Sequence, residues 1–326
     1  MAALVAVLLG AFIAVSRDAT PAPAAVARPS LRRAWSRPEI RRGLVLTAAF
    51  VVAQKAATLQ ILAEGRFTLG LGSGENLNEH VVGEGWPSVA DRQDMLAEAI
   101  EIIRKLHTGE LVDFRGEFFQ VDAARIWDLP DQPVPIGVAV AGNAGIETFG
   151  PLADHLIAVE PDADFIKAWN EHSSTPTVDG QRSRAIGQIP ISWDPTSEKA
   201  AIRRAHEQFR WFAGGWAVNA DLPTTAGFDG ATAFVREDDV AEQLACGPDL
   251  DAMVDKIRPY WEAGFTDIAL VQIGGETQDA FLKEAAAPLL DKLRSAYLGQ
   301  IQEFSTFLPV FDKFIDDIRQ RVGHTI

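Results

Sequence analysis

The chain has 326 residues, of which 47% are hydrophobic and 23% are charged. This balance is typical of folded globular proteins and excludes a disordered chain. The formal net charge of −15 argues against nucleic acid and anionic membrane surfaces as partners, because both would repel an acidic protein.

The charge is spread unevenly along the chain. Residues 1–50 contain seven Arg and two acidic residues, a net charge of +5, so the remainder carries −20. Such an asymmetry indicates two segments of different role. The single cysteine, Cys246, excludes a disulfide within the chain, and the six histidines show no metal-binding spacing. We therefore expect no metal site.

The first 15 residues are apolar apart from Gly10. A membrane-spanning helix needs about 20 such residues, so the run is short for a span. A signal peptide, a membrane anchor, a buried helix and a misread start of the chain remain open interpretations. The arginine-rich stretch 28–42 predicts a solvated basic linker, with regular structure beginning near Leu44.

From Leu44 onward, helical patterns alternate with short apolar strands. Small residues at Ala53, Ala56 and Ala57 would let the first helix pack closely, and residues 111–121 predict a hairpin that turns at Arg115-Gly116. Helices are expected over residues 44–63, 89–107, 197–212, 240–245 and 250–263, with one more helix that follows the last strand and runs to residue 293.

Five short, nearly continuous apolar strands are expected, over residues 66–72, 134–140, 155–160, 186–192 and 267–272. Strands of this kind, separated by helices, indicate a parallel sheet in an α/β fold. A doubly wound sheet satisfies the count, and so does most of an eight-stranded (β/α) barrel.

The run from Gly70 to Glu79, GLGSGENLNE, leaves the first of these strands and enters a loop. In barrel enzymes the active site lies at this end of the strands. Gly72 and Gly74 would let a flat ligand approach the backbone, and Glu75 and Asn78 would point functional groups at it. A tight turn followed by a helix cap explains the same residue types without a ligand. The run lacks the spacing of a phosphate loop or a dinucleotide-binding loop.

A second glycine-containing run, AVAGNAG over residues 139–145, ends another strand and begins a helix. Backbone N–H groups at such a helix start form a natural phosphate site. Close packing of the strand on the helix would require the same small residues, so both interpretations stay open.

The stretch AATLQILAEGRFTLGLGSGENLNEHVVG resembles the fourth-strand region of the luciferase-like superfamily. It is most similar to the branch related to F420-dependent glucose-6-phosphate dehydrogenase, with its G-[ST]-G-E-x-L-N-E run. The similarity continues through VDFRGEFFQVDAARIWDLP and VPIGVAVAGNAG, and returns at EQFR, NADLP, ACGPD and YWEAGFTDIALVQIG. It covers roughly residues 53–295, and the residues before it match no part of the family.

The resemblance implies a TIM-barrel fold, here incomplete because the first three βα units have no counterpart. It implies coenzyme F420, a deazaflavin, as the cofactor, and Glu75 as the group that gives or takes the proton accompanying hydride transfer. It implies that Asn78 hydrogen-bonds the cofactor and that Gly72 and Ser73 line its ring. Main-chain N–H groups would hold the cofactor phosphate at Ala141, Gly142 and Gly145.

Two departures from the family limit this inference. A Ser/Thr-Gly-Lys element that grips the sugar phosphate is replaced by Val159-Glu160-Pro161-Asp162, whose negative charge would repel a phosphate, so glucose 6-phosphate is not expected as the substrate. The family's catalytic His in an early S-D-H element is absent, because no His precedes His80.

The resemblance divides the chain into an N-terminal segment over residues 1–43, a barrel domain over 44–295 and a helical extension over 296–326. The leading hypothesis is an F420-dependent oxidoreductase acting on a small organic substrate, cytoplasmic unless residues 1–15 direct export or anchoring, and a homodimer as its relatives usually are. A flavin mononucleotide (FMN) monooxygenase of the same superfamily and a non-catalytic protein, either a degenerate chain or an anchored binding protein, are the alternatives. Titration with F420 and FMN would separate the three.

Overall fold

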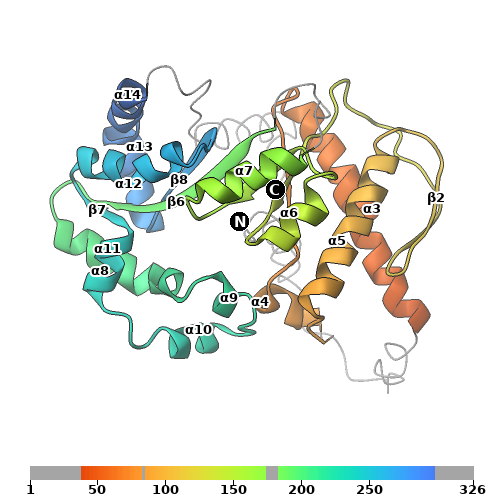
Figure 1. The fold of residues 1–326 in the computed structure, drawn as a ribbon, viewed down its shortest axis with the longest axis horizontal. Helices are drawn as coiled ribbons and strands as arrows, with labels where there is room; N and C mark the ends of the chain where they lie inside the picture. Colours follow the sequence, from red (N-terminus) through yellow and green to blue (C-terminus); the bar gives the residue numbers. More distant parts are fainter. Residues whose placement is uncertain (1–37, 83–84, 174–182, 298–326) are drawn as a thin grey trace, which may run out of the picture.

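The computed structural model describes residues 38–82, 85–173 and 183–297. Their main feature is a parallel sheet covered by helices (Figure 1). Its strands are β1 (Leu69–Leu71), β4 (Ile136–Ala139), β5 (His155–Ala158), β6 (Ala185–Trp193), β7 (Ala245–Gly247) and β8 (Asp267–Gln272). The expected α/β fold with a parallel sheet is therefore confirmed.

The sheet runs in the order β1-β4-β5-β6, with β7 and β8 both paired to β6. Ile186 pairs with both β5 and β8, and Ile191 pairs with both β7 and β8. Since a strand has only two edges, β5 and β7 share one edge of β6 and β8 takes the other. Within the described residues, β1 and β8 each pair with a single strand, so the sheet is open there.

The apolar strand residues explain why the sheet is buried. Ile136, Val138, Leu156 and Ile191 are fully buried, as expected for parallel strands with packing on their faces. They belong to one large core that also includes the inward residues of the covering helices.

One helix precedes the first strand, and the others occupy the connections between the strands or follow the last one. They are α3 (Pro38–Leu62), α4 (Asn76–Glu79), the 3-10 helix η1 (His80–Val82), α5 (Val89–Leu106), α6 (Asn143–Phe149), α7 (Ala163–His172), α8 (Glu198–Phe209), the 3-10 helix η2 (Arg210–Gly214), α9 (Trp216–Asn219), α10 (Thr225–Ala231), α11 (Glu237–Gln243), α12 (Leu250–Glu262), α13 (Gly275–Glu284) and α14 (Ala286–Ala296). The expected hairpin is also present, as the antiparallel strands β2 (Val112–Arg115) and β3 (Gln120–Ala124).

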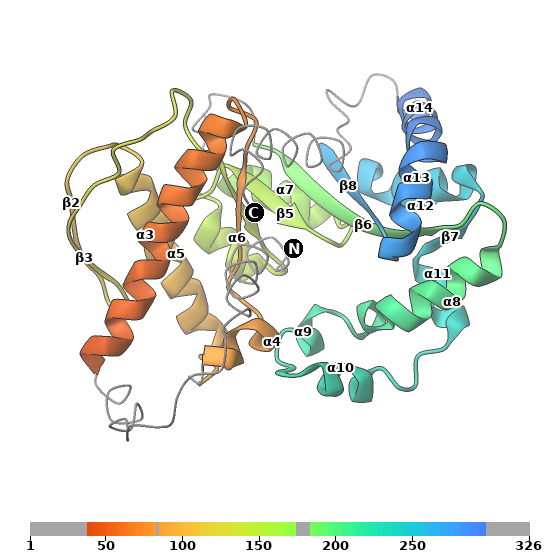
Figure 2. The same cartoon turned by 180° about the vertical axis from the view of Figure 1, so that it is seen from behind.

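Helices α3 and α5 lie side by side in both views (Figures 1 and 2). Ala53, Ala56 and Ala57 are buried, as their small size predicts. His107, at the end of α5, is hydrogen-bonded through its Nε2 to the carbonyl of Ala53 at 2.9 Å. This histidine therefore ties the two helices together.

Three sequence-based expectations about elements were wrong. The first helix begins at Pro38 rather than near Leu44, so the end of the expected basic linker is helical; proline is favoured at the first position of a helix. The expected helix 240–245 ends at Gln243, and Ala245–Gly247 forms a sixth parallel strand, too short to show a period. The expected helix after β8 is two helices, because Pro288 fits only the first turn of α14.

The residues that follow β6 build most of a second and smaller apolar cluster. Its buried members are Ala205 on α8, Val235, Val240 on α11 and Leu244, together with Ile273, which follows β8. In Figures 1 and 2, α8, α9, α10 and α11 lie together on one side of the sheet, and α9 lies close to α4. We call residues 194–244 the insertion.

The terminal segments fall outside the described residues. The expectations for residues 1–37, and for the helical extension beyond Tyr297, concern those parts of the chain. Among the described residues, no helix combines the length and apolar character needed to cross a bilayer.

Candidate active site

The loop after β1 carries the candidate acid/base residue. The chain leaves β1 at Leu71, turns at Gly74 with a φ of +87°, and enters the short helix α4 after Glu75. A positive φ of this size favours glycine, so Gly74 is required by the backbone itself. The carbonyl of Glu75 accepts hydrogen bonds from the N–H groups of Asn78 and Glu79, both at 3.0 Å.

The Glu75 carboxylate lies beside the Asn78 amide. Asn78 donates a hydrogen bond from Nδ2 to Glu75 Oε2 at 3.2 Å, and both side chains are half-buried. Burial raises the pKa of the Glu75 carboxyl above its ordinary value, because desolvation penalises the charged form. The structure therefore brings together the two residues that the sequence singled out in this loop.

The loop after β4 carries the candidate phosphate-binding amides. Gly142 precedes α6 in an extended conformation and provides no side-chain cap. An added Cβ at Gly142 would meet no atom within 4 Å, so this position faces open space. Among the described residues, nothing accepts a hydrogen bond from the N–H groups of Ala141 or Gly142.

Gly145 is placed differently from its two predicted partners. It is buried, and its N–H group already donates to the carbonyl of Gly142 at 3.0 Å. A Cβ at Gly145 would lie 2.6 Å from Cγ1 of Val140. Close packing therefore accounts for this glycine, as the alternative interpretation of the run proposed.

The two loops are neighbours because β1 and β4 pair in parallel, with Leu71 opposite Val138. A Cβ built on Gly72 would lie 3.6 Å from Cβ of Ala139, which places the beginnings of the loops in contact. Gly72 is exposed and Ser73 half-buried. Both loops thus leave the carboxyl end of the sheet, where barrel enzymes bind their ligands.

Residues of the insertion contact the Glu75 loop, which sequence reasoning missed. The N–H group of Asn76 donates to the carbonyl of Ala220 at 2.9 Å, and its Nδ2 donates to the carbonyl of Asp221 at 2.9 Å. Trp86 Nε1 donates to Asp221 Oδ1 at 2.8 Å. These contacts join residues about 140 positions apart, so no local periodicity reveals them.

The segment after β5 contains Glu160 and Asp162, the acidic residues that stand where the resembling family has its Ser/Thr-Gly-Lys element. Asp162 caps α7, because its Oδ1 accepts from the N–H groups of Asp164 at 2.9 Å and Phe165 at 3.1 Å. Glu160 is exposed, and the hydroxyl of Tyr260 donates to the carbonyl of Val159 at 2.6 Å. Asp162 therefore serves as the N-cap of α7, while the carboxylate of Glu160 is open to solvent.

A polar cluster lies at the carboxyl ends of β6 and β8. The buried side chain of Gln272 bonds both the N–H and the C=O groups of Trp193, at 2.9 and 3.0 Å. Arg204 donates to the same carbonyl at 2.7 Å and pairs with Asp194 at 3.4 Å. Burial opposes ionisation of Asp194, but bonds from the Thr196 and Ser197 amides and from Arg204 outweigh it and lower the pKa of this carboxyl. The cluster anchors the insertion to the sheet.

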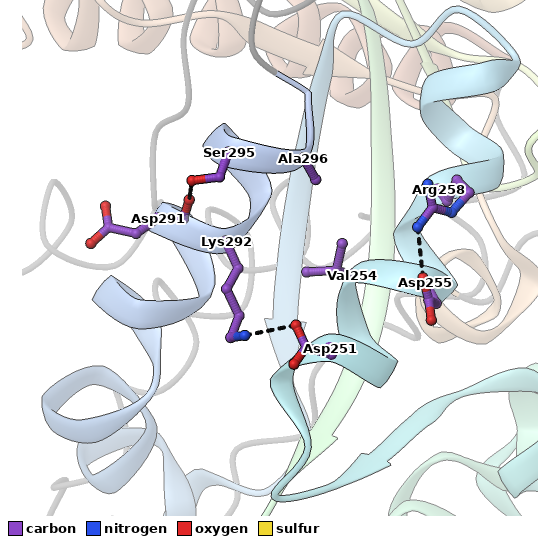
Figure 3. A pocket seen from close by; sticks show the side chains of 8 residues that line it. All are labelled: Asp251, Val254, Asp255, Arg258, Asp291, Lys292, Ser295 and Ala296. Carbon is purple, nitrogen blue, oxygen red and sulfur yellow. Dashed lines mark hydrogen bonds and ion pairs between the residues drawn. The ribbon is translucent and has the colours of Figure 1, made fainter.

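A shallow pocket of about 470 Å³ lies away from these loops, between α12 and α14 (Figure 3). Four of its charged side chains pair with one another, Lys292 with Asp251 and Arg258 with Asp255, both at 2.7 Å. It contains none of the predicted site residues. Over the described ranges, no group of three or more His, Cys, Asp or Glu side chains is arranged to hold a metal ion.

A parallel sheet covered by helices, with two glycine-containing loops at its carboxyl end, defines the chain as an α/β protein. The chain belongs to the luciferase-like monooxygenase family, whose model matches residues 43–267.

Comparisons with individual proteins agree. The chain is 30% identical to an F420-dependent glucose-6-phosphate dehydrogenase of Amycolatopsis mediterranei, over 77% of this chain and 78% of the relative. It is 30% identical to an F420-dependent hydroxymycolic acid dehydrogenase of Mycobacterium tuberculosis, over 65% of this chain and 58% of the relative. A solved F420-dependent secondary alcohol dehydrogenase, in complex with an F420-acetone adduct, is 27% identical with a TM-score of 0.59, covering 68% of each chain.

Proposed function

We propose that this chain is an F420-dependent oxidoreductase that moves a hydride between the deazaflavin and a small organic substrate. The observation that carries the proposal is the half-buried Glu75–Asn78 pair at the carboxyl end of β1, next to the β4 loop. The two relatives and the solved structure named above are F420-dependent by their names, which supports the same cofactor here.

The residues of the two loops fit such a cofactor. Gly72, Ser73 and Asn78 would line and hold the deazaflavin ring. The N–H groups of Ala141 and Gly142, which have no acceptor among the described residues, would hold its phosphate, since free amides at a loop of this kind favour an anion. Gly145 would act indirectly, by letting this loop pack on β4. The cofactor supplies the hydride chemistry, while the protein supplies orientation and electrostatics.

Glu75 would move the proton that accompanies hydride transfer. A hydride transfer to or from a carbonyl carbon needs a matching proton transfer at the oxygen. A carboxyl whose pKa is raised by burial keeps its proton closer to neutral pH, which suits a proton donor. The amide of Asn78 fixes the direction of this carboxyl through the 3.2 Å hydrogen bond.

The substrate we propose is an uncharged alcohol, aldehyde or activated alkene rather than glucose 6-phosphate. The exposed carboxylate of Glu160 follows β5 at the end of the sheet that carries the site, where a phosphate would be repelled.

The test is turnover with F420 and a panel of small alcohols and aldehydes, followed through the deazaflavin absorbance. Glu75→Gln should keep cofactor affinity and lower turnover by about 10²–10⁴-fold, because the general acid is lost. Glucose 6-phosphate serves as the matched charged substrate and should not react. Turnover by Glu75→Gln equal to that of the parent at every pH would refute the role of Glu75.

A further inference from the structure

Helix α4, which follows Glu75, has little stability of its own. It contains four residues, Asn76–Glu79, and none of them is buried. A helix this short does not form alone in water, because the conformational entropy lost in fixing the first turn exceeds the free energy gained from its hydrogen bonds. The left-handed turn at Gly74, with a φ of +87°, separates this helix from β1. Contacts from outside the loop must therefore hold it in place.

The insertion supplies those contacts. Asn76, the first residue of α4, donates its backbone N–H to the carbonyl of Ala220 and its side-chain amide to the carbonyl of Asp221, both at 2.9 Å. Ala220 is buried, so the first of these bonds is shielded from water. Figures 1 and 2 both show α4 beside α9, the helix that leads into Ala220.

A second contact, from Trp86, holds the side chain of Asp221. Trp86 donates from Nε1 to Asp221 Oδ1 at 2.8 Å, and its ring covers the Arg92 guanidinium, 3.8 Å from the ring centroid. Arg92 is itself buried on α5 and donates to the carbonyl of Pro87 at 2.7 Å. Asp221 is thereby fixed to a helix that belongs to the core of the sheet.

We propose that Asn76, Trp86 and Asp221 form a latch that positions the Glu75 carboxyl, so that the insertion sets the geometry of the acid/base group. The inference rests on the proposed role of Glu75. The three are positioning residues, because they act through the Glu75 loop. A displacement of Ala220 and Asp221 would then displace Glu75, so the position of the insertion and that of the proton-transfer group are coupled.

Substitutions at Asn76 remove the latch in steps. Asn76→Ala deletes the side-chain bond alone. Asn76→Pro deletes the backbone bond as well, and proline is tolerated there because the first helical position suits its φ and Glu75 before it is extended, at φ −132° and ψ 137°. Trp86→Phe removes only the Nε1–H donor and keeps a ring over Arg92. Asp229→Asn is the control, because Asp229 lies on the same insertion but pairs with Arg210.

Two measurements on the full chain test the latch without cofactor or substrate. Hydrogen exchange reports opening of α4 at the amides of Asn78, Glu79 and His80. The carboxyl carbon resonance of Glu75, assigned by its loss in Glu75→Gln, reports the protonation midpoint of this residue. A change that only lowered global stability would leave that midpoint unmoved. F420 titration of the parent tests the proposed function separately.

We expect exchange at these amides to be about tenfold faster in Asn76→Pro, with smaller effects in Asn76→Ala and Trp86→Phe. The Glu75 midpoint should fall toward its ordinary value, because a loosened loop lets water reach the carboxyl. Asp229→Asn should match the parent in both measurements. Exchange in the Asn76 and Trp86 variants equal to that of Asp229→Asn would overturn the latch. Faster exchange with an unmoved midpoint would overturn its action on Glu75.

Discussion

At the scale of single residues, the backbone and the side chain of Glu75 have separate roles. Its backbone carbonyl begins α4, which any residue could do, while its side chain lies half-buried beside an amide. A surface cap gains nothing from burying a carboxyl, and burial costs free energy when the group is charged. The sequence singled out this residue from its glycine neighbours, but the burial that raises its pKa depends on the fold around it.

The burial of Glu75 should make the stability of the protein depend on pH. Because the pKa of Glu75 is raised in the folded state, the stability it contributes is present below its unfolded pKa and is lost as pH rises through the folded value. Glu75→Gln should therefore melt at or above the parent's temperature at pH 8 and near it at pH 4. Glu147→Gln, an exposed position on α6, should change little at either pH. A Glu75→Gln variant destabilised mainly at pH 8 would show that the carboxylate is stabilised by the fold.

Cys246 should be poorly reactive in the folded chain. Burial raises the pKa of its thiol to about 11, and the positive charge of Arg204 opposes this shift only in part. At pH 8 its thiolate is then roughly 100-fold scarcer than that of an unstructured cysteine, and alkylation should slow by a similar factor. Mass spectrometry after iodoacetamide treatment measures the rate, with the guanidinium-unfolded chain as control. Equal rates in the two states would contradict the burial of this thiol.

At the scale of elements, the glycines of the two loops have different structural roles. Gly74 permits a left-handed turn, Gly142 leaves open space, and Gly145 allows contact with Val140. The sequence placed both runs after strands, which the structure confirms. It could not assign each glycine, because backbone conformation and neighbouring side chains decide that and neither is visible in the residue pattern.

A pair of substitutions tests this division. Gly145→Ala places a Cβ 2.6 Å from Val140 Cγ1 and should cost about 1–3 kcal/mol of unfolding free energy through overpacking. Gly142→Ala should change stability by less than about 0.5 kcal/mol, since nothing lies near its Cβ. Its extended φ of −165° suits alanine. Chemical denaturation measures both variants. If Gly142→Ala lowers the free energy of unfolding as much as Gly145→Ala does, the position of a Cβ at residue 142 is not open space.

At the scale of the whole molecule, the strands that could be predicted were those with continuous apolar runs. Residues 134–140 contain β4, whose Ile136 and Val138 are buried, and residues 267–272 coincide with β8, in which Ile268 is buried while Val271 is exposed. Ala245–Gly247 was missed because three residues show no period and pairing with Ile191–Trp193 alone defines them as a strand. The insertion's contacts with Asn76 and Trp86 were invisible for a similar reason, since they join distant parts of the chain.

The proposed function requires that the two loops at the carboxyl end of the sheet bind a deazaflavin. Fluorescence titration of the full chain with F420, with FMN as the competing cofactor, measures this binding. We predict saturable F420 binding, weaker binding of FMN, and a loss of about 1–3 kcal/mol of F420 binding free energy in Asn78→Ala, where a half-buried hydrogen-bonding partner of the cofactor is removed. Absence of F420 binding, or FMN binding as tight as F420 and insensitive to Asn78→Ala, would contradict the account.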